Sequence, residues 1–197
     1  DYIDDSQFFT ETWLYAPKPN DTWDYGYINF TRFGRDSSRV TDERQALFAT
    51  YTFSPLLKIT PMFSYIEQEP PSSVKSKQYR PLVDFTGVYD LKYLRLTYRL
   101  RGEHQFRESL ANKWNFRPRA GFEVPLAVGG LSPYIFANIE SFYDSILGQW
   151  YRYRGLTGIG CALTDKIAID IYVGRQLQWK GTKSDFSLVG TILKLKF

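Results

Sequence analysis

The stretch YLRLTYRLRG, residues 93–102, alternates apolar and polar side chains from Leu94 to Arg101. Its apolar positions are Leu94, Leu96, Tyr98 and Leu100, and the positions between them are Arg95, Thr97, Arg99 and Arg101. A period of two places successive side chains on opposite faces of a β-strand. Two environments suit such a strand: a soluble sheet with its leucines in a core, or a membrane barrel with its leucines in lipid and its arginines in a polar lumen.

Strand-like runs of this kind recur along the whole chain, and no amphipathic helix of useful length competes with them. Eleven runs can be counted in the 197 residues, with no linker between them, so we expect one domain over residues 1–197. Single-chain bacterial barrels have an even number of strands. We therefore expect ten strands, with residues 1–20 partly outside the barrel wall, and twelve strands as the next alternative.

The composition narrows the class of protein. The net charge is only +4, and the basic residues are dispersed among 21 acids, so we expect no nucleic-acid partner. No apolar run is long enough for a membrane-spanning helix. A negative mean hydropathy still fits a membrane barrel, because half of each spanning strand is polar. The only cysteine, Cys161, excludes an internal disulfide and is interpreted as a small packing residue.

The connections between runs alternate in apparent length. Segments 54–57, 90–92 and 164–166 look like tight turns, whereas segments 34–43, 69–77, 104–112 and 143–149 look like longer polar loops. Short turns on the periplasmic side and long loops outside are typical of outer-membrane barrels. Aromatic residues near the run ends predict two interfacial belts. These are Tyr15, Phe53, Tyr89, Tyr134 and Phe197 on the periplasmic side, and Phe33, Tyr65, Trp114, Tyr151 and Trp179 on the outer side.

The polar faces of the runs predict a lumen lined by paired charges. Their cations are almost all arginines, which bind carboxylates through two parallel hydrogen bonds and suit confined ion pairs. Runs that carry acids flank the runs that carry arginines. A solvent-facing sheet of a lipocalin-like or sandwich protein is the alternative. The predicted ladder consists of Asp84, Arg95, Arg99, Arg101, Glu103, Arg117, Arg119, Glu123, Glu140, Arg152, Arg154 and Asp170.

The end of the chain supports the membrane interpretation. Leu193, Leu195 and Phe197 alternate along the last run, and Phe197 is the final residue. A final aromatic on an amphipathic strand resembles the signal by which bacterial outer-membrane barrels are recognised for insertion. We therefore expect the barrel-insertion machinery to be a partner through the C-terminal strand.

Five segments carry a resemblance to a known family: YRLRGEHQF, NFRPRAGFEVPL, YIFANIESFYD, YRYRGLTGIGCAL and YVGRQLQW. They resemble the small outer-membrane β-barrels of domain-of-unknown-function family 2490, over roughly residues 80–197. The resemblance implies an integral, porin-like protein of a Gram-negative outer membrane, in contact with lipids, lipopolysaccharide and other outer-membrane proteins. It brings no established activity and no catalytic residues.

Three functions remain open from the sequence. The first is a barrel with a salt-bridged, largely occluded lumen and a structural or accessory role, as a subunit of a larger outer-membrane complex. The second is a narrow passive channel that prefers small anions, because lumen arginines attract them. The third is a lipid hydrolase that uses His104, with Glu103 and Ser109 near it in sequence. We expect no enzymatic activity, no cofactor and, with one histidine and one cysteine, no metal site.

Overall fold

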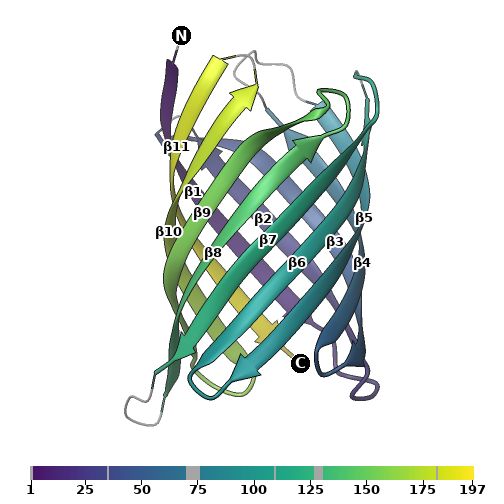
Figure 1. Cartoon of the computed structure of the whole chain (residues 1–197), viewed down its shortest axis with the longest axis vertical. Coiled ribbons are helices and arrows are strands. Elements are labelled where there is room, and N and C mark those ends of the chain that lie inside the picture. The colour runs from purple at the N-terminus through teal and green to yellow at the C-terminus, as the bar shows by residue number, and fades with distance from the viewer. Residues whose placement is uncertain (1, 35, 70–75, 109, 127–130, 181) are drawn as a thin grey trace.

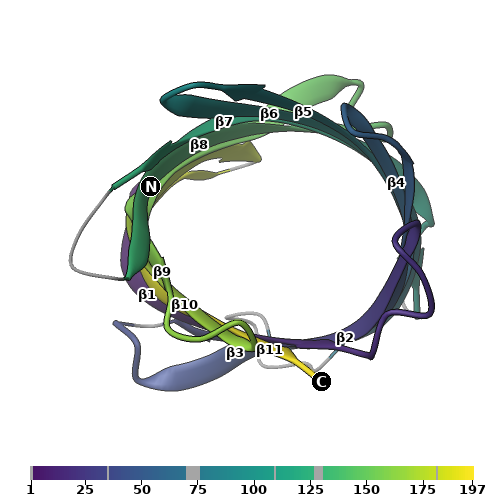
Figure 2. The ribbon, with the colours of Figure 1, turned by 90° about the horizontal axis from the view of Figure 1, so that it is seen from below.

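Eleven β-strands close into one barrel in the computed structural model of the protein (Figure 1, Figure 2). The structure describes residues 2–34, 36–69, 76–108, 110–126, 131–180 and 182–197. The strands are β1 (Tyr2–Tyr15), β2 (Trp23–Gly34), β3 (Arg39–Ser54), β4 (Leu57–Gln68), β5 (Ser76–Leu91), β6 (Leu94–Arg107), β7 (Lys113–Pro125), β8 (Ser132–Asp144), β9 (Gln149–Ala162), β10 (Ile167–Lys180) and β11 (Thr182–Lys196). Each strand pairs with its neighbours in the chain, and β1 closes the barrel against β11.

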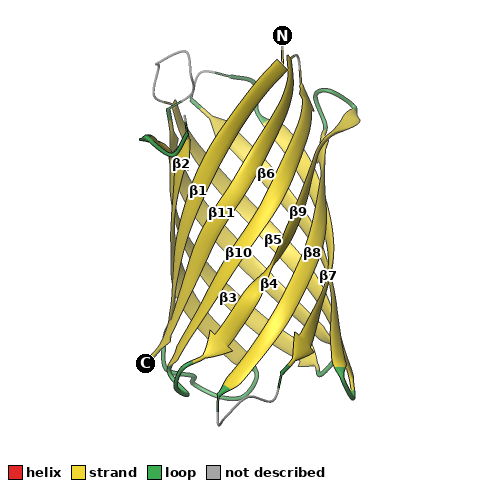
Figure 3. Ribbon diagram, turned by 90° about the vertical axis from the view of Figure 1, so that its left-hand side faces the viewer, coloured by secondary structure: helices red, strands yellow, loops and turns green. Residues whose placement is uncertain are grey.

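The expectation of ten strands is wrong, because the first run is a full strand of the wall. An odd number of strands leaves the two ends of the barrel chain at opposite ends of the barrel, as Figure 3 shows. The closing pair must then be parallel, and β1 pairs with β11 in parallel from Tyr2↔Lys183 to Tyr15↔Lys196. All other pairs are antiparallel. Closure satisfies the backbone groups of both edge strands, which hydrocarbon requires.

The connections do not alternate in length as the sequence pattern indicated. At the end that carries Phe197, the lower end in Figure 1, they span residues 16–22, 55–56, 92–93, 126–131 and 163–166. At the upper end they span 35–38, 69–75, 108–112, 145–148 and 181. The expectation failed because the strands continue into segments that look like loops. β3, for example, already begins at Arg39, after a turn in which Asp36 and Ser37 have left-handed φ values of 54° and 62°.

The outward surface of β6 to β10 is largely apolar, with Arg175 of β10 as an exposed charged residue. Tyr98, Ile139, Ile159, Ile171 and Val173 are each more than half exposed, although they lie within strands. A soluble sheet would bury these side chains, whereas lipid solvates them. Within the described residues, no helix is long and apolar enough to cross a membrane.

Three of the aromatics expected in the belts turn into the barrel instead. Tyr15, Tyr134 and Tyr151 line its interior, whereas Phe53 and Trp114 are well exposed outside. The sequence pattern located these residues at strand ends but did not fix which face they occupy.

Part of the interior is filled by apolar packing. An apolar cluster forms where β1, β10 and β11 meet, with Phe9, Tyr172 and Leu188 at its centre. Aromatic rings also lie over strand glycines: a Cβ at Gly160 would collide with the ring of Tyr134. The partners packed against the cluster are Phe30, Phe136, Leu156, Phe186 and Ile192. This side of the barrel interior is therefore lined largely by apolar packing.

Candidate functional site

The candidate site is the charged wall of the lumen on β5 to β8. The antiparallel register places arginine against arginine across β6 and β7, Arg99 opposite Arg119 and Arg101 opposite Arg117. Like charges directly opposite each other repel. The two strands therefore depend on carboxylates from their neighbours β5 and β8, and these carboxylates organise the site.

Asp84 on β5 neutralises one of these arginines. It lies opposite Arg101 in the register. The Nε and Nη2 atoms of Arg101 each donate a hydrogen bond of 2.7 Å to the two oxygens of Asp84. Arg99 approaches the same carboxylate, with its Nη1 atom 3.8 Å away. The two-pronged pair fixes the guanidinium plane, which a single lysine contact would not do.

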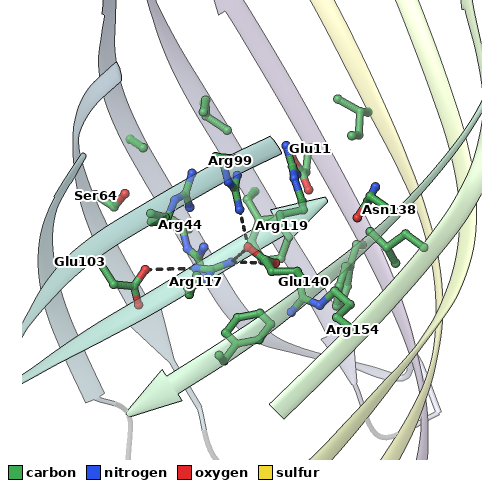
Figure 4. A pocket seen from close by; sticks show the side chains of 18 of the residues that line it. Glu11, Arg44, Ser64, Arg99, Glu103, Arg117, Arg119, Asn138, Glu140 and Arg154 are labelled. Atoms are coloured by element: carbon green, nitrogen blue, oxygen red, sulfur yellow. Dashed lines mark hydrogen bonds and ion pairs between the residues drawn. The ribbon is translucent and has the colours of Figure 1, made fainter. Parts of the chain in front are cut away.

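Glu140 on β8 contacts arginines of two strands, the adjacent strand β7 and the next strand, β6. Arg117 donates to both of its oxygens, at 3.1 and 3.2 Å, and Arg99 of β6 reaches Glu140 across β7. Arg117 also donates to Glu103 at 3.0 Å. Figure 4 shows this chain from Glu103 through Arg117 and Glu140 to Arg99. We refer to Asp84, Arg99, Arg101, Glu103, Arg117 and Glu140 as the arginine network.

Glu103 anchors the network on the upper side. Its oxygens also accept hydrogen bonds from Asn115 at 2.9 Å and Gln105 at 2.7 Å. Arg80 of β5 lies 3.8 Å away. A buried carboxylate is tolerated when it is paired and fully hydrogen-bonded, and Glu103 meets both conditions.

The arginine network is nearly inaccessible to water. The side chains of Arg99, Arg117, Glu140 and Glu103 are 11%, 8%, 5% and 3% exposed. They face the barrel interior, where neighbouring side chains cover most of their surface.

Other members of the predicted ladder lie apart from the network. Among the described residues, Arg119 has no hydrogen bond or salt bridge, although it lies opposite Glu140 in the register. Arg152 and Arg154 donate to glutamines, at 2.6 Å to Gln178 and 2.7 Å to Gln176. The sequence therefore identified the arginines but did not identify their partners.

The remaining members lie near the lower end. Arg95 donates to Asp90 at 2.5 Å and lies 3.8 Å from Glu123, and both Arg95 and Glu123 are well exposed to solvent. Asp170 accepts hydrogen bonds from the hydroxyl of Tyr134 at 2.6 Å and from Lys194 at 2.7 Å. These contacts form separate groups below the arginine network.

Sequence reasoning missed the cations of β2, β3 and β5. Arg32 and Arg44 both approach the buried carboxylate of Asp42, at 3.5 and 3.7 Å. The alternation in β2 is inverted, because Phe30 faces inward while Asn29 on the outer face is exposed. Because of this inversion, the inward-facing residues of β2 cannot be recognised by their polarity. Only the two-residue spacing of Arg32 and Arg44 from other inward-facing residues of their strands could have placed them in the lumen.

A cavity with a volume of about 710 Å³ runs along the lumen beside the arginine network. Among the described residues, its charged lining contains twice as many cations as carboxylates. The cations are Arg32, Arg44, Arg80, Arg99, Arg101, Arg107, Lys113, Arg117, Arg119, Arg152, Arg154 and Lys194, and the carboxylates are Glu11, Asp42, Glu103, Glu123, Glu140 and Asp170. Such a lining attracts anions.

His104 does not form a catalytic pair with the residues near it in sequence. It faces outward between the rings of Phe106 and Trp114, with ring centroids 4.4 and 4.6 Å away. Glu103, the preceding residue, points into the lumen on the opposite face, and Ser109 lies outside the described residues. In the described part of the chain, no three His, Cys, Asp or Glu residues are grouped to hold a metal ion.

The C-terminal strand is paired on both sides, with β10 and with β1. Leu193 and Leu195 alternate along it, and the backbone N–H of Phe197 donates to the carbonyl of Tyr15 at 3.2 Å. The Phe197 side chain is exposed at the lower end. Its role as an insertion signal stays a prediction.

Comparison with protein families matches residues 14–187 to the family described as Protein of unknown function (DUF2490). The match covers most of the chain, so the protein belongs to this family. Comparison with curated proteins gives no match.

Among solved structures, the fold is similar to that of LpxR from Salmonella typhimurium. The TM-score is 0.58 with 9% sequence identity, over 92% of this chain and 86% of that chain. At this identity the likeness concerns the fold, and the fold is that of an outer-membrane barrel. LpxR is an enzyme, which overturns the expectation that the protein is not one: the fold is compatible with enzymatic activity.

Proposed function

We propose that this outer-membrane barrel keeps its lumen closed at mid-height through the arginine network, and that the closed barrel has a structural or accessory role in an outer-membrane assembly. The observation that carries the proposal is the low exposure of Arg117, Glu140 and Glu103, which face the barrel interior. Charged groups so poorly accessible leave little room for a continuous water path. On the opposite side, the apolar cluster around Phe9 and Leu188 narrows the lumen.

The physical basis of closure is mutual compensation of charge. Asp84 and Glu140 each contact two arginines of the network, so loss of either carboxylate leaves two buried arginines without that partner. Breaking a buried pair by removing one partner is far more costly than the net gain from forming it. The network therefore resists local opening.

A second candidate, a narrow pathway for small anions, is favoured by a different observation. The cavity lining has a large excess of cations, and Arg119 lacks a hydrogen bond or salt bridge among the described residues. An arginine without a carboxylate can offer its donors to a passing anion. The two candidates differ in whether the wild-type barrel conducts.

Efflux from liposomes tests the proposal. Wild-type protein reconstituted into chloride-loaded vesicles is expected to leave the efflux rate at the level of empty vesicles. The Glu140→Ala variant is expected to raise chloride efflux above potassium efflux, because Arg99 and Arg117 lose their shared partner. Chloride-selective efflux by the wild type would favour the anion pathway instead.

A further inference from the structure

One register row of the lumen wall contains more arginines than the arginine network uses. The row crosses β6, β7, β8 and β9, and it consists of Arg99, Arg119, Glu140 and Arg154. Arg119 and Arg154 therefore flank Glu140 on both sides, and all three line the same cavity (Figure 4). Glu140 pairs instead with Arg99 and with Arg117. Within the described residues, the two flanking arginines have no salt bridge.

Both flanking arginines have N–H donors that no described residue accepts. Arg119 is partly exposed to the cavity and makes no hydrogen bond, so all of its donors are available. Arg154 donates to Gln176 through Nε and Nη2, which leaves the donors of Nη1. Asn138 lies beside them on β8, opposite Gly121 of β7. A Cβ at Gly121 would lie 2.9 Å from the Cβ of Asn138, so the glycine leaves room for this carboxamide.

The charge of this region selects a dianion. The arginine network has as many arginines as carboxylates, so Arg119 and Arg154 add an excess of two positive charges. Uncompensated charge in a poorly hydrated interior is costly, and a ligand with two negative charges would compensate it. Guanidinium groups present parallel donors to two oxygens of one ligand, which suits an oxyanion better than a chloride ion.

Glu140 discriminates between oxyanions. A carboxylate repels a dianion beside it, unless the ligand donates a hydrogen bond to the carboxylate. Among the described residues, the Oε2 atom of Glu140 accepts one hydrogen bond, of 3.2 Å from Arg117, so it can accept another. Hydrogen phosphate carries a hydroxyl group that can donate, whereas sulfate and the dianion of a phosphate ester carry none. We propose that the two flanking arginines and Asn138 bind one hydrogen phosphate ion, whose hydroxyl group donates to Glu140.

The phosphate site is reached from inside the barrel. It lies on the inward face of β7 to β9, so the wall separates it from the lipids of the bilayer. The cavity extends to Leu110 in the upper connection 108–112, where a small ion can enter from water. The inference does not rest on the closed lumen, because a bound ion is compatible with a closed barrel and with a conducting one.

Binding of inorganic phosphate to the purified protein tests the proposal. Equilibrium dialysis with radiolabelled phosphate is carried out in non-ionic detergent at mildly alkaline pH. We expect one phosphate per barrel, and a Kd that rises by about ten-fold or more in Arg119→Gln and in Arg154→Gln. Arg95→Gln is the matched control and should bind as the wild type does, because Arg95 is an exposed arginine of β6 outside the cavity lining. Heat-modifiable gel mobility confirms that each variant is folded.

Competition tests the contact with Glu140. Unlabelled phosphate should displace the label, whereas sulfate and glycerol 3-phosphate should displace it poorly, because neither dianion has a hydroxyl group on its sulfur or phosphorus atom. Glu140→Gln should lose much of this preference. Three results would overturn the proposal: no stoichiometric binding of phosphate, equal weakening in Arg119→Gln and Arg95→Gln, or displacement by sulfate as effective as by phosphate.

Discussion

The two sides of the lumen are lined by different chemistry. On β5 to β8 the arginine network lines the interior with guanidinium and carboxylate groups, whereas near β1, β10 and β11 the apolar cluster does so with Phe9, Tyr172 and Leu188. The side chains of both regions are poorly accessible to solvent. The charged side depends on complementary partners, and the apolar side depends on shape. We therefore expect the arginine network to be destabilised by the removal of a single charge, and the apolar cluster by the removal of side-chain volume.

The largest effect is expected from Glu140→Ala. It removes the carboxylate that Arg99 and Arg117 share, and breaking a buried ion pair costs about 3–5 kcal/mol. Urea unfolding in detergent or liposomes measures the loss. Glu140→Gln, which retains hydrogen-bond acceptors at the same size, is the control and should lose less. Equal stability of wild type and Glu140→Ala would show that the network is not structural.

Leu188→Ala addresses the apolar side. Leu188 is almost fully buried in the apolar cluster, and removing a buried leucine side chain costs about 2–4 kcal/mol through lost burial and a residual cavity. Sulfate in the unfolding assay sharpens the comparison, because it can pair with arginines freed by Glu140→Ala. Sulfate should restore more stability to Glu140→Ala than to Leu188→Ala, and equal restoration would argue against a chemical difference between the two sides.

Ile171→Arg tests whether the outward face of the barrel wall contacts lipid. Ile171 is 55% exposed on the face of β10 that we assign to lipid. An arginine near the bilayer midplane costs roughly 2–4 kcal/mol and less toward the interfaces. The folded fraction in liposomes, measured by heat-modifiable mobility, should fall relative to Ile171→Leu. Unchanged folding would contradict the assignment of the outward face.

The smallest effect on stability is expected from Arg119→Ala. Arg119 lies opposite Arg99 and has no hydrogen bond or salt bridge among the described residues. Its removal deletes packing but also relieves repulsion, so the change in unfolding free energy should stay within about 1 kcal/mol. Arg117→Ala is the matched comparison and should be far more damaging. Similar losses for both variants would mean that position in the network is unimportant.

The sequence predicted the barrel because period-two alternation in β6 to β10 separates lipid-facing from inward residues. It did not predict the strand number, since the even-number rule excluded Tyr2–Tyr15 from a full place in the wall. It also missed Arg32 and Arg44, because Asn29 faces outward and Phe30 faces inward, which inverts the polar and apolar faces of β2. The expected interfacial positions of Tyr134 and Tyr15 were wrong because a strand-end aromatic can turn inward and pack over the lumen.

The partners of the arginines could not be predicted from alternation alone. Contact between Glu140 and Arg99 spans β7, so it depends on strand tilt and register across three strands. Neither quantity follows from which residues are polar. Asp84 and Arg101, in contrast, lie opposite each other on adjacent strands joined by the two-residue connection 92–93.

Single-channel recording in planar bilayers tests the central claim most directly, with wild type, Glu140→Ala and Arg119→Ala measured side by side. If the arginine network closes the lumen, the wild type and Arg119→Ala show no steady conductance, and Glu140→Ala shows brief, anion-selective openings. Stable wild-type openings whose anion preference falls in Arg119→Ala would contradict the closed lumen and establish the anion pathway.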